Sequence, residues 1–276
     1  MRRCFVIASL LLCISPYTKA QITATHSLTA ATECSSRYSL AVLRGDQLPA
    51  LLGSRVDNIQ LFRNDEGKLR PIRFQVDRKD ELDRYLLAEK TSDNDIRLDG
   101  NDEIVFMQAD AGSRLQTGHG APGLIELKLG KGTSQPTSWL YAQSEAPAEN
   151  ANLDSLIRYQ PEQRSVRTPL YTIGFSAQYP FLVNSLNWKL PGANEWSPDI
   201  SDTMKIRHRG SLLGLFAFHR TQEDYRSKLV ASKSGPLRII LRTENRVRIW
   251  WKLGTPALYI DYVMMPDGFV MDSIID

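Results

Sequence analysis

Short runs of β-branched and aromatic residues, separated by turn-forming residues, dominate this chain of 276 residues. Runs of this length and composition are typical of β-strands. Clusters rich in Asn, Asp and Gly bound them, for example residues 63–67 and 99–102, and favour turns. The spacing predicts an all-β chain with antiparallel strands in a sandwich. The expected strands cover residues 38–43, 58–62, 72–76, 103–107, 124–129, 138–142, 203–208, 211–219, 237–242, 247–253, 257–264 and 269–276.

Residues 144–155 are polar and small, and they predict a linker between two domains. An antiparallel β-sandwich domain is expected at 21–143, followed by a second, larger antiparallel β domain at 156–276. Residues 243–245 (Thr-Glu-Asn) predict a turn between two strands of the second domain. The strand-like residues 269–276 fit a domain that is incomplete as well as one that ends in an edge strand.

Residues 1–20 have the pattern of a cleaved signal peptide. Arg2 and Arg3 precede an apolar stretch at 4–14, and the small residue Ala20 precedes the expected cut. The apolar stretch is shorter than the ~20 residues that span a bilayer. The sequence therefore predicts export to the periplasm or the extracellular space, with no transmembrane segment in the mature chain.

Removal of the signal peptide changes the charge of the protein. The whole chain has 34 basic and 31 acidic residues, and the predicted signal contains Arg2, Arg3 and Lys19. The remainder is neutral, so it has no overall field to attract nucleic acid. Cys34 is the one cysteine left, which excludes a disulfide scaffold and leaves the reactivity of this thiol open.

An acidic stretch at 92–103 offers oxygen ligands of the kind that Ca²⁺ prefers. It lacks a complete EF-hand pattern. The alternative interpretation is an acidic turn in which Asp and Asn side chains bind their own backbone. Calcium is the one cofactor that the sequence suggests, and its candidate ligands are Asp93, Asp95, Asp99, Asn101 and Glu103.

Basic and aromatic residues alternate in several of the expected C-terminal strands, and alternation places such side chains on one face. Guanidinium groups pair with carboxylates and sugar rings stack on indoles, so this face would suit an acidic polysaccharide. A loop with two further tryptophans could add platforms for sugars or buried anchors. The alternative is a solvated face balanced by neighbouring Asp and Glu. The candidate ligand-binding residues are Arg207, Arg238, Arg248, Trp250, Trp188 and Trp196.

Catalytic motifs for nucleophilic chemistry are absent from the sequence. Glu195 and Asp199 are close enough in sequence to suggest a carboxylate pair for glycoside hydrolysis. His208 and His219 lie in successive expected strands and are predicted to oppose each other across a hairpin, where they could act as a base or bind a metal. The simpler interpretation is two histidines with satisfied hydrogen bonds in a sheet.

Residues 74–78 (Phe-Gln-Val-Asp-Arg), 98–107 (Leu-Asp-Gly-Asn-Asp-Glu-Ile-Val-Phe-Met) and 110–112 (Asp-Ala-Gly) form a pattern. The pattern resembles a module of uncharacterised bacterial secreted or periplasmic β-rich proteins. Residues 235–240 and 259–262 are compatible with the same proteins. The resemblance covers residues 71–112 and implies a β fold in the bacterial envelope. Similar phrases occur in β-rich proteins associated with polysaccharide use, so it also favours a glycan-related role. It implies no catalytic residue.

The sequence leaves two main functional hypotheses. The preferred one is a non-catalytic exported protein that binds a glycan or another envelope partner, because no catalytic motif is recognisable. The alternative is a glycan-active enzyme, a hydrolase or lyase, that uses carboxylate and histidine acid–base chemistry. A purely structural role in the envelope is a third hypothesis.

Overall fold

The computed structural model describes residues 37–87, 96–116, 123–129, 138–145, 154–190, 192–212, 216–250 and 253–274. These residues form antiparallel sheets, turns and short 3₁₀ helices, with no α-helix among them. The predicted all-β class is therefore confirmed. The predicted signal peptide, Cys34, Asp93, Asp95 and most of the predicted linker lie outside the described residues. Within the described ranges, no helix has the length and apolar character needed to cross a membrane.

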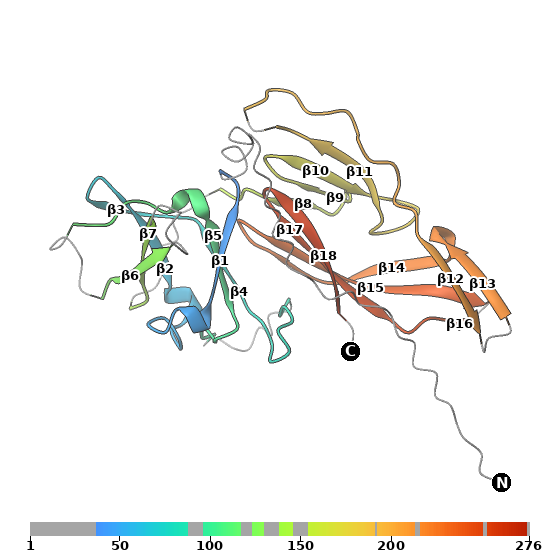
Figure 1. Ribbon diagram of the computed structural model, residues 1–276, viewed down its shortest axis with the longest axis horizontal. Coiled ribbons are helices and arrows are strands. Elements are labelled where there is room, and N and C mark those ends of the chain that lie inside the picture. Colours follow the sequence, from blue (N-terminus) through green and yellow to red (C-terminus); the bar gives the residue numbers. More distant parts are fainter. Residues whose placement is uncertain are drawn as a thin grey trace, which may run out of the picture.

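Two antiparallel sheets build the N-terminal unit, defined here as residues 37–145 (blue to green in Figure 1). One sheet has the strand order β1 (Leu40–Arg44), β5 (Glu103–Met107) and β4 (Phe74–Asp77). The other has the order β3 (Lys68–Pro71), β2 (Gln60–Asp65), β7 (Ser138–Gln143) and β6 (Ile125–Leu129). A single apolar core takes side chains from both sheets, because successive strand residues point to opposite faces. Its fully buried members include Leu61, Ile104, Phe106 and Leu140.

Three sheets build the C-terminal unit, defined here as residues 154–274 (yellow to red in Figure 1). The first has the order β11 (Val183–Trp188), β10 (Tyr171–Phe175), β9 (Ser165–Arg167) and β8 (Arg158–Gln160). The second has the order β14 (Tyr225–Ser234), β15 (Ile239–Trp250), β17 (Leu258–Met265) and β18 (Gly268–Ile274), and β16 (Leu253–Gly254) also pairs with β15. The third is the hairpin of β12 (Arg207–Leu212) and β13 (Phe216–Thr221).

The first two sheets of the C-terminal unit share one core. Ile173 of β10 and Leu241 of β15 are both completely buried in it. Two tyrosines also bond across it. The Tyr171 hydroxyl lies 2.8 Å from the carbonyl oxygen of Gly268, and the Tyr262 hydroxyl donates to the carbonyl of Phe181 at 2.7 Å. Buried hydroxyls need such partners, so the two bonds fix how the sheets face each other.

The predicted turn at 243–245 is wrong, because β15 continues through these residues as one strand of twelve. Thr243 and Asn245 are buried, and the Asn245 amide donates to the Thr243 hydroxyl at 2.9 Å and to the Leu258 carbonyl at 3.1 Å. Core hydrogen bonds therefore override the local turn preference of these residues. The strands β3, β8 to β11 and β14 were not expected from the sequence.

The acidic turn before β5 approaches the backbone closely at Gly45. The Gly45 N–H donates to the Asp102 carbonyl at 2.9 Å, and a Cβ atom built at Gly45 would lie 1.9 Å from the carbonyl oxygen of Asp99. Any side chain at this position would therefore force the two backbone segments apart. At Gly100, in the same turn, the nearest atom to such a Cβ is 3.7 Å away.

We expect Gly45→Ala to lower the free energy of unfolding by about 1–3 kcal/mol, the usual cost of forcing extra volume into a packed site. Gly100→Ala is the matched control and should change stability by less than about 0.5 kcal/mol. Urea unfolding of the two variants measures both values. Equal stabilities would show that the Gly45 contact is not as tight as described.

Candidate functional site

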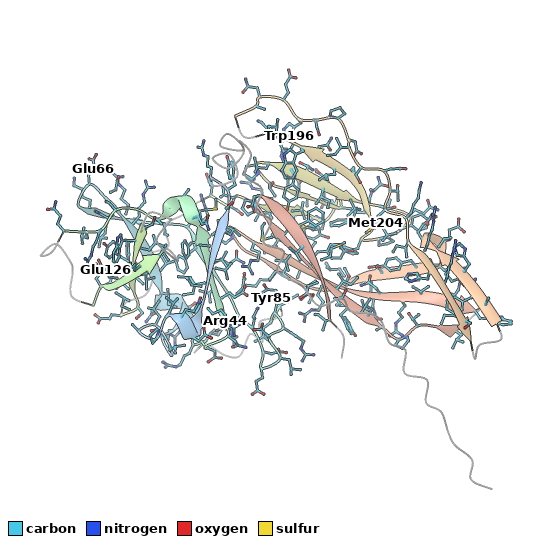
Figure 2. All side chains as sticks on the ribbon, in the orientation of Figure 1. Arg44, Glu66, Tyr85, Glu126, Trp196 and Met204 are labelled. Carbon is cyan, nitrogen blue, oxygen red and sulfur yellow. The ribbon has the colours of Figure 1, made fainter. Side chains whose placement is uncertain are left out.

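The motif residues of the N-terminal unit meet the C-terminal unit in a buried polar cluster. Strands β4 and β5 pair with Asp77 opposite Glu103, and the loop before β15 brings Arg238 against both. Tyr85 reaches the same place from the segment that follows β4, and Figure 2 shows it at the junction of the two units. We call this cluster the interunit network; it comprises Gln75, Asp77, Lys79, Tyr85, Glu103 and Arg238.

Arg238 is the centre of the interunit network and is only 2% exposed. Its Nη1 atom donates to Glu103 Oε2 at 2.6 Å and to the Tyr85 hydroxyl at 2.8 Å. Its Nε atom lies 3.4 Å from Asp77 Oδ2. Lys79 adds a second cation, with Nζ 2.7 Å from Glu103 Oε1. Lys233 adds a third, with Nζ 3.4 Å from Asp77 Oδ1. The buried carboxylates are therefore compensated by three cations, as buried charges require.

Gln75 ties the network to the backbone of the C-terminal unit. Its Oε1 atom accepts the N–H of Arg238 at 2.9 Å, and its Nε2 atom donates to Asp77 Oδ1 at 2.7 Å. A Cβ atom at Gly235 would lie 2.1 Å from Gln75 Oε1. A glycine at 235 is thus what allows the Gln75 amide to bind this loop. The Gln-x-Asp motif at 75–77 therefore contacts the Gly-Pro-Leu-Arg segment at 235–238, which is distant in sequence.

The electrostatics of the network favour its charged form. Burial raises the pKa of Glu103, but hydrogen bonds from Lys79 and Arg238 outweigh it, so the pKa is lower than usual for a glutamic acid. Burial raises the pKa of Tyr85 and keeps its hydroxyl protonated. Asp102 beside the network has a raised pKa, mainly through burial. The ion pairs and hydrogen bonds of Arg238 with Asp77, Glu103 and Tyr85 therefore join the two units.

The acidic stretch that suggested calcium folds as a turn where it is described. Asp102 accepts the backbone N–H groups of Asp99 and Lys79 at 2.9 and 2.8 Å. Asn101 donates to the carbonyl of Asp80, and Glu103 belongs to the interunit network. In the described part of the chain, no three Asp, Glu, His or Cys side chains are placed to hold a metal. Asp93 and Asp95 lie outside it.

The predicted basic stripe is divided between different surroundings. Arg238 is buried in the interunit network, so it cannot belong to an exposed ligand-binding face. Arg248 is exposed but donates to Asp224 Oδ1 at 2.8 Å, and Arg246 pairs with Glu244 at 2.9 Å. Trp250 is 64% exposed. Neighbouring carboxylates therefore balance this face. Arg207 is exposed on β12, away from β15 in the strand pairing.

The predicted opposition of the two histidines is wrong. In the hairpin of β12 and β13, His208 pairs with Arg220 and His219 pairs with Arg209. A register offset of one residue places the two imidazoles on opposite faces. The carboxylates do not converge with them either. Glu195 is exposed, and Asp199 accepts the backbone N–H groups of Leu186 and Ser201.

The two tryptophans that were expected in one loop have different roles, and Trp188 is the last residue of β11. Trp188 is partly buried against the core, with its ring stacked on Tyr171 at 6.0 Å. Trp196 instead lies among cations, with Arg167 Cζ 5.7 Å and Lys189 Nζ 5.9 Å from its ring centroid. Figure 2 shows Trp196 over the sheet of β8 to β11. The prediction of Trp196 as a sugar platform therefore gains basic neighbours that the sequence analysis missed.

Arg158 and Arg167 stand directly opposite each other on β8 and β9. Their row continues across the sheet through Thr172 to Asn187. Like charges in opposed positions destabilise a sheet. Among the residues that the structure describes, neither arginine has a carboxylate within ion-pair distance. We call Arg158, Arg167, Lys189 and Trp196 the cationic patch. A pocket of about 320 Å³ borders it, lined by Ser155, Leu156, Arg158, Gln160, Arg167 and Thr168.

We expect Arg238→Met to lower the free energy of unfolding by about 3–5 kcal/mol, because it leaves two buried carboxylates without their main cation. Arg246→Met removes an exposed ion pair and should cost less than about 1 kcal/mol. Denaturant unfolding compares the two. Equal costs would contradict a central role for Arg238, and Arg238→Lys provides a milder variant that keeps the charge.

The lowered pKa of Glu103 predicts a specific pH dependence. A carboxyl group with a depressed pKa in the folded state stabilises the fold above its ordinary pKa, and this stability is lost as the pH falls through the folded-state pKa. Asp102 has a raised pKa, so its effect on stability has the opposite pH dependence. This effect is the same in the wild type and in Glu103→Gln, and it cancels when the two are compared. Unfolding measured from neutral pH to about pH 3 should therefore show a shallower acid loss in Glu103→Gln than in the wild type. Parallel profiles would count against the proposed charge state of Glu103.

No protein-family model, curated protein or solved structure matches this chain. The resemblance of residues 71–112 to secreted β-rich proteins therefore stays a prediction. Its residues nevertheless have a physical explanation, because they build the contact between the two units. Function has to be inferred from the surfaces and cavities of the chain itself.

Proposed function

We propose that this chain is an exported, non-catalytic binding protein that recognises an acidic glycan through the cationic patch of its C-terminal unit. The observation that carries the proposal is the opposed pair Arg158 and Arg167 beside Trp196. We also infer that each unit is a β-sandwich, because two sheets contribute to each core. The outer face of β8 to β11 is then the flat surface on which the glycan lies.

The chemistry of the cationic patch fits a sugar that carries carboxylates. A guanidinium group binds a carboxylate through two parallel hydrogen bonds, and a bound anion would relieve the repulsion between Arg158 and Arg167. The Trp196 indole offers an apolar surface to a sugar ring. Thr172 and Asn187 continue the row with groups that can bond to hydroxyls. Charge and stacking therefore act on one ligand from adjacent positions.

A binding role also agrees with the positions of the candidate acid–base residues. Asp199 caps backbone amides, and His208 and His219 point to opposite faces of their hairpin. Acid–base catalysis needs groups that reach the same bond. A glycan held on the cationic patch would meet cations and an indole. Of the two hypotheses from the sequence, these positions favour the binder.

Titration calorimetry with an oligogalacturonate tests this function, and its methyl ester provides a ligand with the same skeleton and no charge. We expect the acid to bind more tightly than the ester, and we expect added salt to weaken it. Arg158→Gln and Arg167→Gln should each weaken binding of the acid about tenfold, which corresponds to about 1.4 kcal/mol. Trp196→Ala should weaken both ligands, because stacking does not depend on charge.

Arg248→Gln is the matched control for these variants. It removes an exposed arginine of the same unit that already pairs with Asp224, so it should leave the affinity unchanged. A loss in this variant equal to that in Arg167→Gln would place the ligand on the β15 face instead. Failure of the acid to bind the folded wild type would reject the proposal.

A further inference from the structure

Two hairpins lie together at one end of the C-terminal unit. One is the hairpin of β12 and β13, and the other is formed by β15 and β16. Arg220 of β13 joins them, because its Nε atom donates to the backbone carbonyls of Arg248 and Ile249 at 3.0 Å. Figure 1 shows β12, β13 and β16 at the end of the unit that lies away from the N-terminal unit. We call this surface the hairpin end, defined by Arg207, Arg209, Arg226, Arg248, Trp250 and Leu253.

The hairpin end exposes large apolar side chains. Trp250 is 64% exposed and Leu253 is 52% exposed, and the two are partners in the strand pairing. Partners in an antiparallel pair point to the same side, so these two side chains form one apolar surface. Residues 251–252 and 213–215 join the strands and lie outside the described residues; in sequence they are Trp-Lys and Leu-Gly-Leu. Exposed apolar surface of this kind marks a site of contact with a protein or a membrane.

Basic residues surround this apolar surface. Residues 205–228 and 244–258, which include both hairpins, contain nine Lys and Arg but three Asp and Glu. The chain without its predicted signal peptide is neutral overall, so positive charge is concentrated at this end. A local excess of one sign attracts partners of the opposite sign. The partner of the hairpin end is therefore expected to be anionic.

Strand alternation places the arginines on two sides of the hairpin end. His208 of β12 and Val247 of β15 both line a cavity of about 510 Å³. The side chains of Arg207 and Arg209 alternate with that of His208, so they project to the other face of their hairpin. Arg248 alternates with Val247 in the same way and also points away from the cavity. Arg209 and Arg248 lie within roughly 10 Å of the ends of β12 and β15.

Three arginines of the hairpin end have no acidic partner. Among the residues that the structure describes, no carboxylate lies within ion-pair distance of Arg207, Arg209 or Arg226. Arg226 donates to two backbone carbonyls at 3.0 and 3.1 Å. It also stands opposite Arg246 in the pairing of β14 and β15, where like charges repel. An anionic partner would compensate these charges without breaking an ion pair of their own.

We propose that the hairpin end binds the surface of an anionic bilayer. Trp250 and Leu253 enter the interfacial region, where tryptophan is especially favourable. The arginines on both sides contact lipid phosphates. An apolar end with cations on either side suits a plane of headgroups into which the end projects, and apolar area and charge both add to such binding. The hairpin end shares no residue with the cationic patch, so this contact is independent of glycan binding.

Co-sedimentation with vesicles tests this contact, using the protein without its predicted signal peptide. Vesicles of phosphatidylglycerol and phosphatidylcholine in equal parts should bind it about tenfold or more tightly than vesicles of phosphatidylcholine alone. Added salt should weaken the binding, because it screens the attraction. Brominated lipid should quench the fluorescence of the wild type more than that of Trp250→Phe, because the quenched indole has to lie at the lipid.

Leu253→Ala measures the apolar part of the contact. It should weaken binding to the anionic vesicles about fivefold, because less apolar area enters the interface. Leu82→Ala is the matched control: Leu82 is 69% exposed but belongs to the N-terminal unit, so this variant should bind as the wild type does. Circular dichroism and thermal melting verify that both variants are folded.

A double variant measures the charged part. Arg207→Gln combined with Arg209→Gln should weaken binding to the anionic vesicles about tenfold or more, since each basic residue near the surface adds to the attraction. Arg158→Gln combined with Arg167→Gln removes the same charge from the cationic patch and should bind the vesicles as the wild type does. This control separates a specific surface from attraction by net charge.

Several outcomes would overturn this proposal. Failure of the folded wild type to bind the anionic vesicles would reject it. Equal binding to neutral and anionic vesicles would show that the arginines do not contact lipid. Equal losses in the two double variants would show attraction by net charge without a specific surface. A wild-type dimer in sedimentation velocity that replaces vesicle binding and is lost in Leu253→Ala would assign the apolar side chains to a contact between two copies.

Discussion

Arg238 determines how the two units of this protein fit together. A guanidinium removed from water is costly unless carboxylates and hydrogen bonds compensate for it. Here the carboxylates come from β4 and β5 of one unit, and the arginine comes from the loop before β15 of the other. Glu103 has a cation of its own unit in Lys79, whereas Asp77 pairs with Lys233 and Arg238 of the other unit. The charges are therefore compensated in the arrangement in which Asp77, Glu103 and Arg238 meet.

This arrangement also covers one face of the C-terminal unit. Tyr85 and Leu87 pack on Ile240 and Val263, which point away from the unit's own core. Arg242 of the same face pairs with Asp261 at 2.7 Å and donates to the backbone of Tyr85. Contact between the units thus uses the part of β15 nearest Arg238. The β12–β13 hairpin at the far end of the unit is away from this contact (Figure 1). The segment before β8 lies close to it, because the Leu156 N–H donates to the Pro236 carbonyl at 2.8 Å.

The sequence could predict those parts of the fold that depend on local pattern. Residues 103–107 become β5 with the expected bounds, because an apolar run after an Asp-Gly turn has few alternatives. The turn expected at 243–245 failed because Asn245 finds its partners in the core, among residues distant in sequence. The arginine pair of the cationic patch was missed for a similar reason. Arg158 and Arg167 lie on strands of three residues, and only the register places them opposite each other. The sequence did contain one signal for this hairpin. Residues 161–164 (Pro-Glu-Gln-Arg) favour a turn, and short alternations of polar and apolar residues flank them.

The interunit network explains why the motif residues would be polar at all. A well-packed apolar contact could hold the two units about as strongly, since the cost of burying ions offsets much of their attraction. An apolar contact, however, would tolerate sliding, because it has no direction. Gln75 accepts the backbone N–H groups of Leu237 and Arg238 and needs a glycine at 235 to reach them, so a shift of one residue would leave several buried groups unpaired. We infer that the network is used for register more than for strength. On this view the motif of residues 74–112 defines the joint between the units, and the proposed ligand recognition uses surfaces that the joint leaves open.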